Sequence, residues 1–446
     1  MEKYINPILP NFEEESKGFS PEEALCESNK CLNCKKPLCR TGCPVNNNIP
    51  GFIQEIKKGD YAAANKILFE TSNLPAICSR VCPHENQCQG SCILGKKGTA
   101  VSIGKLERFV ADYVADNELS ETVPFKQNGQ KVAIIGSGPA GLAAAYDLAR
   151  LGYAVTIFEA ESTPGGVLTF GIPEYRLPKT IVNREIAKLK KLGVKIKSNT
   201  VIGEDLSLDD IFNQGFEAIF IASGAGSPRK IDIRGVYLPG VFYANYFLAT
   251  VNLVNLGKLR REEIPIYPGD DIVVIGAGNV AIDAARTCKR LGAEKVTILY
   301  RGDYAAIPAL DAELHAAEEE GIEIMCKVQP VKILGTTRVT GIRCTKIQSS
   351  ETEKHDETTN SEFNLNVTKV ILAIGQRPRS RIVSTTENVT TDTHGYLVTS
   401  KDSFGHTTRE GVFAGGDVVT APATVVSAMK QGKAIAIEIH SYLVSK

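Results

Sequence analysis

The sequence predicts an α/β protein with two Rossmann-like units, preceded by a small helical segment rich in cysteine. Three observations support this fold class. An apolar strand, a glycine-rich turn, an Ala-rich helix and a second strand begin at Lys131, and the same pattern begins again at Asp271. Ahead of both, nine of the twelve cysteines lie between Cys26 and Cys92. We therefore expect a helical domain, with an inorganic group held by cysteines in its core, followed along the chain by two parallel sheets.

The composition excludes several classes of protein. The chain has 446 residues, of which 43% are hydrophobic and 23% charged, as in globular rather than disordered proteins. Its 51 basic residues equal its 51 acidic residues, which argues against a broad basic face for nucleic acid or an anionic membrane. No apolar run is long enough to span a membrane, and the start of the chain lacks a signal-peptide core. We expect a cytoplasmic protein without nucleic-acid or membrane partners.

The cysteine spacing separates three kinds of site. The first group reads Cys31-x2-Cys34-x4-Cys39-x3-Cys43-Pro44, and the second reads Cys78-x3-Cys82-x5-Cys88-x3-Cys92. Disulfides need an oxidising compartment, and nine is an odd number. Structural zinc sites usually pair two CxxC knuckles, and the second group has none. Four cysteines that close on Cys-Pro are typical of ferredoxins, whose last cysteine serves a different cluster. The spacing favours two iron–sulfur clusters, with zinc and disulfides as alternatives.

Apolar periodicity predicts helices around these cysteines. The stretches at 49–60, 61–72 and 101–116 each place apolar residues at helical spacing. Asn73-Leu74-Pro75 should break the second of these helices. The polar stretch at 120–130 contains Pro and Gly and predicts a linker to the first Rossmann-like unit.

The first glycine-rich turn has the form that binds a dinucleotide. It reads Gly136-x-Gly138-x-x-Gly141, and the second strand ends at the acidic residue Glu159. Glycines let the backbone approach a pyrophosphate, the helix N-terminus stabilises its charge, and an acid in this position accepts from ribose hydroxyls. The alternative is a tight strand–helix turn with no ligand.

The second glycine-rich turn has the same form, but the strand that follows its helix ends at a basic rather than an acidic residue. It reads Gly276-x-Gly278-x-x-Ala281, and Arg301 stands where the first unit has its acid. An acid there would repel a 2′-phosphate, whereas arginine favours it, so this unit predicts NADP rather than NAD. The alternative for Arg301 is a solvated surface arginine. Arg286 on the following helix is a second candidate for the phosphate, with a salt bridge on an exposed helix face as its alternative.

Two such units in one chain predict two dinucleotides, FAD in one and a nicotinamide coenzyme in the other. Two apolar strands at 219–225 and 370–378 end in small residues and are suited to carry the chain between domains. Near the end, a strand runs into Gly415-Gly416-Asp417 ahead of an Ala-rich helix. Glycine allows close approach to a ligand, and the Asp417 carboxylate is placed to accept from ribityl or ribose hydroxyls. Its alternative role is a helix N-cap.

From about Glu22 to its end, the chain resembles the family of the glutamate synthase small subunit. Relatives in that family include the NADPH-binding subunit of NADH-dependent ferredoxin:NADP oxidoreductase and the N-terminal half of dihydropyrimidine dehydrogenase. Besides the cysteine groups, the motifs that carry the resemblance are VSIGKLER, GSGPAGL, GGVLTFGIPEYRLPK, GAGNVAID, AIGQRP and AGGDVV. The resemblance implies two [4Fe–4S] clusters, FAD and NADPH. The implied domains are a helical iron–sulfur domain at 1–128, an FAD-binding domain at 129–232 and 371–446, and an NADPH-binding domain at 233–370.

The resemblance also implies which residues bind these groups. One cluster is expected on Cys31, Cys34, Cys39 and Cys92, and the other on Cys43, Cys82, Cys88 and the carboxylate of Glu107. An exposed helix residue is the alternative for Glu107, and Cys26 and Cys78 are expected to be ordinary small apolar residues. The implied FAD-binding residues are Gly136, Gly138, Pro139, Ala140, Gly141, Glu159, Gly166, Gly416 and Asp417. The implied NADPH-binding residues are Gly276, Gly278, Asn279, Val280, Arg286 and Arg301.

Two departures from related patterns bear on the chemistry. Several relatives have two adjacent basic residues where this chain has Arg301-Gly302, so the preference for NADPH over NADH is weakened. Thioredoxin-reductase-like flavoproteins need a CxxC beside the flavin. The isolated cysteines Cys288, Cys326 and Cys344 are too far apart in sequence to form one. Electrons are therefore expected to leave through the iron–sulfur domain.

The expected reaction follows from the cofactors. NADPH gives a hydride, iron–sulfur clusters take one electron at a time, and a flavin links the two. No acid–base residue is required, so we assign no catalytic residue, although Arg176 in GIPEYRLPK is expected to position the flavin or the nicotinamide. The expected acceptor is a partner such as the large subunit of glutamate synthase. The alternatives are a self-standing reductase of ferredoxin or small oxidants, and a non-enzymatic flavoprotein scaffold or sensor.

Overall fold

The computed structural model describes residues 9–119, 125–348, 357–378, 381–400 and 403–446. Its contacts divide the chain into two compact units. The larger unit contains 14–169, 176–227 and 377–446, and the smaller unit contains the described residues up to Glu13 together with Phe170–Tyr175 and Pro228–Gln376. The start of the expected helical domain, at 1–8, and part of the expected linker, at 120–124, lie outside the described residues. The chain changes unit between Ser227 and Pro228, just beyond the expected stretch 219–225, and between Gln376 and Arg377, within the expected stretch 370–378.

The first part of the larger unit is helical, as expected. The three helices expected from periodicity form as α3, α4 and α6, and the chain leaves helix between Thr71 and Pro75. The side chain of Asn48 caps α3 by accepting a hydrogen bond from the backbone of Gly51. Buried apolar side chains such as Phe52 and Leu106 form a core with several of the cysteines. The elements are α1 (Pro21–Asn29), α2 (Leu38–Gly42), α3 (Ile49–Lys58), α4 (Tyr61–Thr71), α5 (Pro75–Val81), η1 (His84–Asn86), η2 (Ile93–Lys96) and α6 (Ile103–Asp116).

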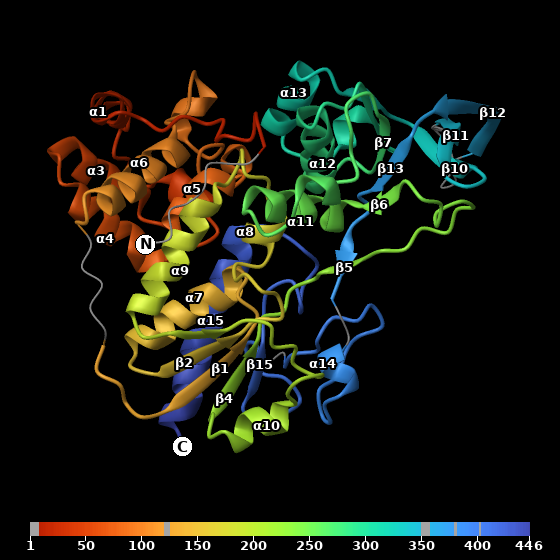
Figure 1. Ribbon diagram of the computed structural model, residues 1–446. Helices are drawn as coiled ribbons and strands as arrows, with labels where there is room; N and C mark the ends of the chain where they lie inside the picture. The colour runs from red at the N-terminus through yellow and green to blue at the C-terminus, as the bar shows by residue number, and fades with distance from the viewer. Residues whose placement is uncertain (1–8, 120–124, 349–356, 379–380, 401–402) are drawn as a thin grey trace. The chain divides into compact units, whose positions relative to one another are not determined.

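The larger unit also contains a five-stranded parallel sheet in the order β15-β4-β1-β2-β3. Its strands are β1 (Lys131–Ile135), β2 (Ala154–Phe158), β3 (Lys195–Lys197), β4 (Ala218–Ile221) and β15 (Val412–Ala414). Its helices are α7 (Pro139–Arg150), α9 (Lys179–Lys191), α10 (Leu208–Asn213), α14 (Arg381–Ser384) and α15 (Val425–Val444). Helices α7 and α15 pack side by side (Figure 1). This arrangement places the glycine-rich turn after β1 close to the segment after β15.

The smaller unit is built on a second five-stranded parallel sheet, in the order β6-β13-β7-β8-β9. Its strands are β6 (Val241–Tyr243), β7 (Asp271–Ile275), β8 (Lys295–Leu299), β9 (Glu323–Met325) and β13 (Lys369–Leu372). Its helices are α11 (Ala244–Asn255), η3 (Arg261–Glu263), α12 (Asn279–Arg290), η4 (Tyr304–Ala306) and α13 (Asp311–Glu319). The expected pair of parallel Rossmann-like sheets behind a helical segment is therefore confirmed.

A separate antiparallel sheet of three strands completes the smaller unit, in the order β10-β11-β12. Its strands are β10 (Val328–Gly335), β11 (Val339–Gln348) and β12 (Glu357–Asn366). The remaining short elements are α8 (Val167–Phe170), β5 (Ser227–Pro228) and β14 (Gln376–Arg377), which lie where the chain changes unit. The sequence pattern did not indicate this sheet, because its strands show no strict alternation of apolar and polar residues.

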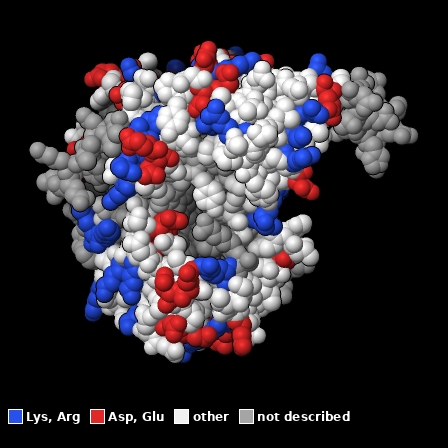
Figure 2. All heavy atoms as spheres, turned by 45° about the vertical axis from the view of Figure 1, so that its right-hand side comes forward, with Lys and Arg blue, Asp and Glu red and all other residues white. Residues whose placement is uncertain are grey.

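The described helices and one face of the surface bear on the expectations drawn from composition. None of the helices in the described residues is both long and apolar enough to cross a membrane. On the face shown in Figure 2, lysine and arginine side chains are interspersed with aspartate and glutamate side chains. No single sign of charge dominates that face.

Candidate cofactor sites

Four of the predicted cluster ligands line one cavity in the helical part. Cys31, Cys34, Cys39 and Cys92 surround a space of about 110 Å³, together with apolar side chains from the same loops. Burial raises the pKa of Cys39 to about 11, and the nearby sulfurs of Cys92, Cys31 and Cys34 contribute to that rise. The structure thus brings together the four cysteines of the first expected cluster, although Cys92 lies more than fifty residues from the others in sequence.

The other four predicted ligands form a second group. Burial raises the pKa of Cys43, with Glu107 as a contributing negative neighbour. The pKa of Cys88 is also raised by burial, then by Glu107 and Cys43. Cys82 belongs to the same group, because Cys78, Glu107 and Cys88 all raise its pKa. These shared electrostatic neighbours show that Cys43, Cys82, Cys88 and Glu107 lie near one another, with Cys78 also beside Cys82 and Cys39 beside Cys88.

Glu107 is buried, so the alternative of an exposed helix residue does not describe it. It lies on α6, its exposed fraction is 8%, and burial raises the pKa of its carboxyl to about 8. Within the described part of the chain, no hydrogen bond or ion pair involves this carboxyl. A buried carboxylate in such surroundings needs a cation to remain ionised. Of the two unassigned cysteines, Cys78 is buried, whereas Cys26 is exposed rather than packed as a small apolar residue.

The first glycine-rich turn is tightly packed. Gly136 follows β1 with a φ of 104°, and a Cβ there would lie 2.6 Å from the carbonyl oxygen of Ala222. A Cβ at Gly141 would lie 2.0 Å from the carbonyl oxygen of Gly136. Gly138 is the N-cap of α7 and Pro139 its first residue, and no side chain caps the helix. The first backbone N–H groups of α7 are therefore available to a ligand.

Glu159 is held beside this turn by Ser137, a residue that the motif leaves unspecified. The Glu159 carboxylate is buried and accepts hydrogen bonds from the backbone N–H of Ser137 at 3.0 Å and from its hydroxyl. The Ser137 hydroxyl oxygen accepts in turn from the backbone N–H of Gly165 at 2.8 Å. A Cβ at Gly166 would lie 2.9 Å from the Cα of Gly138. The GGVL segment is thereby fixed against the glycine-rich turn.

The segment after β15 approaches the same turn. A Cβ at Gly416 would lie 3.2 Å from the Cβ of Ala140. The backbone N–H of Gly416 donates to the side-chain oxygen of Gln431 at 2.8 Å, a contact that no motif indicated. Burial raises the pKa of Asp417 to about 6. Asp417 is not the N-cap of α15, because that helix begins after Thr424.

The second turn repeats the geometry of the first in the smaller unit. Gly276 has a φ of 115°, and a Cβ there would lie 2.4 Å from the carbonyl oxygen of Ala373. Gly278 is the N-cap of α12, which also has no side-chain cap. Asn279 and Val280 are exposed on the first turn of α12, and the side-chain oxygen of Asn279 accepts from the backbone N–H of Leu310 at 3.1 Å.

The two predicted phosphate-binding arginines differ in their surroundings. Arg301 is exposed two residues beyond β8, and no carboxylate among the described residues pairs with it. Arg286 is 2% exposed and forms ion pairs with Glu313 at 3.0 Å and Glu320 at 2.8 Å. The salt-bridge alternative therefore describes the contacts of Arg286 here, although in a buried rather than an exposed position. Its role toward a phosphate stays a prediction.

Steric crowding explains why a glycine stands at position 302, next to Arg301. A Cβ at this position would lie 2.8 Å from the ring of Tyr300, so a second basic side chain beside Arg301 is sterically disfavoured here. Lys327 lies close by, because its backbone N–H donates to the carbonyl oxygen of Gly302 at 3.0 Å. Its ammonium pairs with Asp303 at 2.6 Å. Among the described residues at this end of β8, Arg301 is thus the cation without an acidic partner.

The GIPEYRLPK segment divides between the two units at Tyr175 and Arg176. Tyr175 is fully buried in the smaller unit, with the Arg290 guanidinium 4.0 Å and the Arg286 guanidinium 5.0 Å from its ring centre. Asn252 donates to the carbonyl oxygens of Phe170 at 3.0 Å and Ile172 at 3.1 Å. Arg176 is partly buried in the larger unit. The motif thus contains a buried aromatic anchor that the sequence pattern did not mark.

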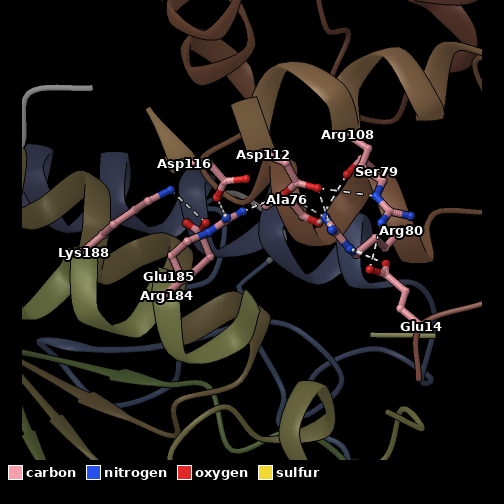
Figure 3. A network of polar contacts seen from close by, with 10 residues as sticks. All are labelled: Glu14, Ala76, Ser79, Arg80, Arg108, Asp112, Asp116, Arg184, Glu185 and Lys188. Carbon is pink, nitrogen blue, oxygen red and sulfur yellow. Dashed lines mark hydrogen bonds and ion pairs between the residues drawn. The ribbon is translucent and has the colours of Figure 1, made fainter. Parts of the chain in front are cut away.

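Within the larger unit, a network of ion pairs joins helices α5 and α6 to helix α9 (Figure 3). Asp112 of α6 accepts from Arg80 of α5 at 2.6 Å and from Arg184 of α9 at 2.7 Å. Glu14 accepts from Arg80 at 2.7 Å and from Arg108 at 2.8 Å. Helix α5 leads directly into Cys82, and α6 carries Glu107 next to Arg108. The network therefore holds the second cysteine group against α9.

Known proteins resemble both parts of this chain. Residues 130–432 match the family model described as pyridine nucleotide-disulphide oxidoreductase, and residues 9–119 match that of dihydropyrimidine dehydrogenase domain II, 4Fe-4S cluster. The NADPH glutamate synthase small chain of Escherichia coli K12 is 33% identical over 95% of this chain and 92% of its own length. The NAD-dependent dihydropyrimidine dehydrogenase subunit PreT of Escherichia coli O157:H7 is 34% identical over 99% and 98%. The resemblance seen in the sequence is confirmed.

Solved structures share the fold of the two-sheet part. FprA of Mycobacterium tuberculosis in complex with NADPH superposes with a TM-score of 0.56 at 20% identity, covering 71% of this chain and 85% of that one. Thioredoxin reductase of T. acidophilum gives a TM-score of 0.55 at 20% identity, covering 71% and 99%.

Proposed function

The chain belongs to the pyridine nucleotide-disulphide oxidoreductase family and is an NAD(P)H-dependent flavin oxidoreductase with a 4Fe-4S domain, and from this we propose its finer function. It uses NADPH, holds FAD in the larger unit and two [4Fe–4S] clusters in the helical part, and delivers single electrons to a partner protein. We keep the three-domain division at 1–128, 129–232 with 371–446, and 233–370 as part of this proposal. The observation that supports it most is that four of the predicted ligands, Cys31, Cys34, Cys39 and Cys92, line one cavity. The other four, Cys43, Cys82, Cys88 and Glu107, are electrostatic neighbours.

The chemistry of these ligand sets suits iron–sulfur clusters better than zinc. Thiolates are soft ligands, and a cluster spreads its four protein ligands over several irons. Around a single zinc ion, with bonds of about 2.3 Å, sulfurs must converge within about 4 Å of one another. Among the described residues, no group of three or more His, Cys, Asp or Glu side chains is arranged to hold one metal ion. The raised pKa values of Cys39 and Glu107 fit buried ligands that ionise when a cationic centre is bound.

In the proposed FAD site, backbone N–H groups and two carboxylates bind the cofactor. The N–H groups at the start of α7 face the place of a pyrophosphate, and the close packing of Gly136, Gly141 and Gly166 keeps that place open. Glu159, held by Ser137, accepts from ribose hydroxyls, and Asp417 accepts from the ribityl chain. When bound, FAD supplies the conversion between a two-electron hydride and single electrons.

In the proposed NADPH site, the uncapped start of α12 holds the pyrophosphate through Gly276, Gly278, Asn279 and Val280. Arg301 binds the 2′-phosphate, since its guanidinium is exposed and unpaired in the described part of the chain. The relatives differ in the coenzyme that their names state, NADPH for the glutamate synthase small chain and NAD for PreT. Arg301 therefore carries the preference for NADPH. Arg176 positions the flavin or the nicotinamide.

The names of the relatives support a protein acceptor. One is a small chain and the other a subunit, so both act within larger assemblies. We propose that this chain is likewise an electron-transfer subunit, as in glutamate synthase. A self-standing NADPH reductase of ferredoxin or small oxidants is the second candidate, favoured by the chain's own complete set of cofactor sites. Capture of a large partner with an affinity-tagged chain from the native cell supports the first. Active, partner-free protein that reduces ferredoxin supports the second.

The cluster assignment has a direct test in paired variants. Cys39→Ser should remove one cluster and Cys82→Ser the other, each reducing the iron content by half. Cys26→Ser is the matched control, because Cys26 is exposed and unassigned. The reduced protein should show two cluster signals in electron paramagnetic resonance, and each variant should lose a different one. Loss of the same signal in both variants would contradict the two sets.

A further inference from the structure

Three large apolar side chains are exposed on the rim of the cavity that the first four cysteines line. Leu32 is 63% exposed, Leu38 42% and Ile93 45%, and all three contribute to that cavity. Single exposed apolar residues are ordinary on protein surfaces. Three at one cavity mouth, from two separate cysteine loops, form a patch of the kind that marks an interaction site. We call Leu32, Leu38 and Ile93 the apolar rim.

The same two loops are strongly basic. Between Glu27 and Glu55, and again between Glu85 and Glu107, the chain carries seven lysines and arginines in all and no acidic residue, whereas the two signs are equal in number over the whole chain. Lys35, Lys36, Lys96 and Lys97 are exposed, and their side-chain ammonium groups make no hydrogen bond or ion pair with any described residue. Lys36 also borders the cavity, and Lys96 ends the short helix that begins at Ile93. Lysines whose ammonium groups have no partner among the described residues thus lie in the same two segments as the apolar rim, and one of them, Lys36, lines the cavity.

These lysines have a second explanation, which is that they offset the negative charge of a thiolate-bound cluster. A residue in that role is expected to lie close to the cysteines, as Lys57 does when it donates to the carbonyl oxygen of Cys31 at 3.0 Å. The four free lysines are instead exposed to solvent, where salt screens their effect on a buried centre. An apolar centre with a charged rim is the usual anatomy of a protein interface. The charges of such a rim steer association.

We propose that the apolar rim and Lys35, Lys36, Lys96 and Lys97 form the docking surface for a protein electron acceptor with an acidic surface and an apolar centre. This inference rests on the proposed function, because only a cluster bound close to this surface would allow electrons to pass from it to a docked acceptor. For each NADPH oxidised to NADP⁺ with release of a proton, two electrons leave, and two one-electron acceptor molecules are reduced. Docking over the cavity mouth brings the acceptor close to the cluster on Cys31, Cys34, Cys39 and Cys92.

The test uses the cluster-loaded, FAD-loaded protein under anaerobic conditions, with an acidic [2Fe–2S] ferredoxin as the probe acceptor. Lys96→Glu/Lys97→Glu should lower kcat/KM for the ferredoxin at least tenfold at low salt, since steering by charge is worth about 10 to 1,000-fold in association rate. Lys190→Glu/Lys191→Glu on α9 is the matched control, an adjacent exposed pair with the same change of charge. That control should change the ferredoxin rate less than twofold. Raising the salt should slow the unchanged protein and have little effect on the Lys96→Glu/Lys97→Glu variant.

Two further readouts separate this proposal from the proposed function. Bleaching of the flavin by NADPH in stopped flow, together with the iron content, should be the same in all these proteins. Leu32→Ser/Ile93→Ser should weaken saturation by ferredoxin at every salt concentration. Equal losses in the Lys96/Lys97 and Lys190/Lys191 variants would overturn the docking surface, as would unchanged ferredoxin reduction in the former. If the unchanged protein bleaches with NADPH but never reduces ferredoxin in a saturable way, the docking surface is also overturned. Failure of NADPH to bleach the flavin would instead overturn the proposed function.

Discussion

Arg184 of α9 donates through Nη2 to Oδ1 of Asp112 on α6, over 2.7 Å. Helix α9 follows the GIPEYRLPK segment, and α6 carries Glu107 five residues before Asp112. Asp112 also accepts from Arg80, which lies two residues before Cys82. One carboxylate thus connects helix α5, which leads into Cys82, with helix α9 inside the larger unit, as Figure 3 shows for Arg80, Asp112 and Arg184.

Replacing Asp112 with asparagine should therefore destabilise the larger unit. The change leaves Arg80, whose side chain is 3% exposed, without its strongest partner. Loss of a charged hydrogen-bond partner at a mostly buried site costs about 2–3 kcal/mol. The control is Asp116→Asn, because Asp116 is 71% exposed and contacts Arg184 only at 3.3 Å, so its loss should cost less than about 1 kcal/mol. Denaturant unfolding measures both changes, and equal losses would contradict the bridging role of Asp112.

The effect of Asp112 should depend on pH in a defined direction. Burial by itself raises the pKa of Asp112, but hydrogen bonds and charges from Arg80 and Arg184 outweigh it, and the pKa lies below the usual 3.8. A lowered pKa in the folded protein stabilises it above the unfolded value and ceases to do so as the pH falls through the folded value. The difference in unfolding free energy between the unchanged protein and Asp112→Asn should therefore be constant from about pH 5 to 8 and shrink below about pH 4.

Glu159→Gln should weaken FAD binding while the fold persists. The Glu159 carboxylate accepts from the N–H and hydroxyl of Ser137 and from the N–H of Glu161. In glutamine, an NH₂ group replaces one carboxylate oxygen and would face a hydrogen-bond donor instead of accepting from it. At least one charge-assisted hydrogen bond is then lost. We expect at least a tenfold rise in the Kd for FAD, measured by fluorescence of the apoprotein titrated with FAD. Glu161→Gln, an exposed residue two positions on, should change the Kd less than twofold.

The two glycines of the second turn should respond differently to alanine. Gly276→Ala should lose thermal stability, because φ is 115° there and the new Cβ would meet a carbonyl oxygen at 2.4 Å. At Gly278 nothing lies within 4 Å of such a Cβ, so Gly278→Ala should fold normally. It should nevertheless raise the KM for NADPH severalfold, because the methyl group occupies the approach of the pyrophosphate. Normal NADPH kinetics in Gly278→Ala would show that this turn is structural only.

Arg301→Ala should lower the selectivity for NADPH. Removing an unpaired guanidinium from the proposed 2′-phosphate site should reduce kcat/KM for NADPH at least tenfold and leave that for NADH within about twofold. Arg338→Ala is the control, an exposed arginine elsewhere in the smaller unit, and it should alter neither value. Steady-state rates with NADPH and with NADH measure this selectivity. A parallel fall with NADPH and NADH would mean that Arg301 does not contact the phosphate.

Local features of this protein were predictable from the sequence, because their causes are local. The glycine-rich turns at Gly136 and Gly276 combine strand, turn and helix within a few residues, and both form as expected. The cysteine spacing and the resemblance together predicted which cysteines would gather, and Cys92 indeed joins Cys31, Cys34 and Cys39 at one cavity. Residues that belong to a motif could be found without the structure.

Contacts made between distant parts of the chain left no such signal. The sequence near Arg286 on α12 gave no sign of its buried ion pairs with Glu313 and Glu320, which lie about thirty residues away. Its role toward a phosphate stays a prediction. Arg184 and Asp112 are 72 residues apart, and nothing in either neighbourhood marks the other. Ser137 occupies a position that the GxGxxG pattern leaves free, so its link to Glu159 could be found only from the fold.

The most direct test of the central claim is an anaerobic titration of the purified protein with NADPH, followed by visible absorbance and electron paramagnetic resonance, together with an iron analysis. The account predicts about eight iron atoms per chain, four for each cluster. It also predicts bleaching of the flavin bands and cluster signals that appear as NADPH is added. A protein prepared without air that bleaches its flavin but contains zinc or no iron would contradict the account, as would clusters that NADPH never reduces.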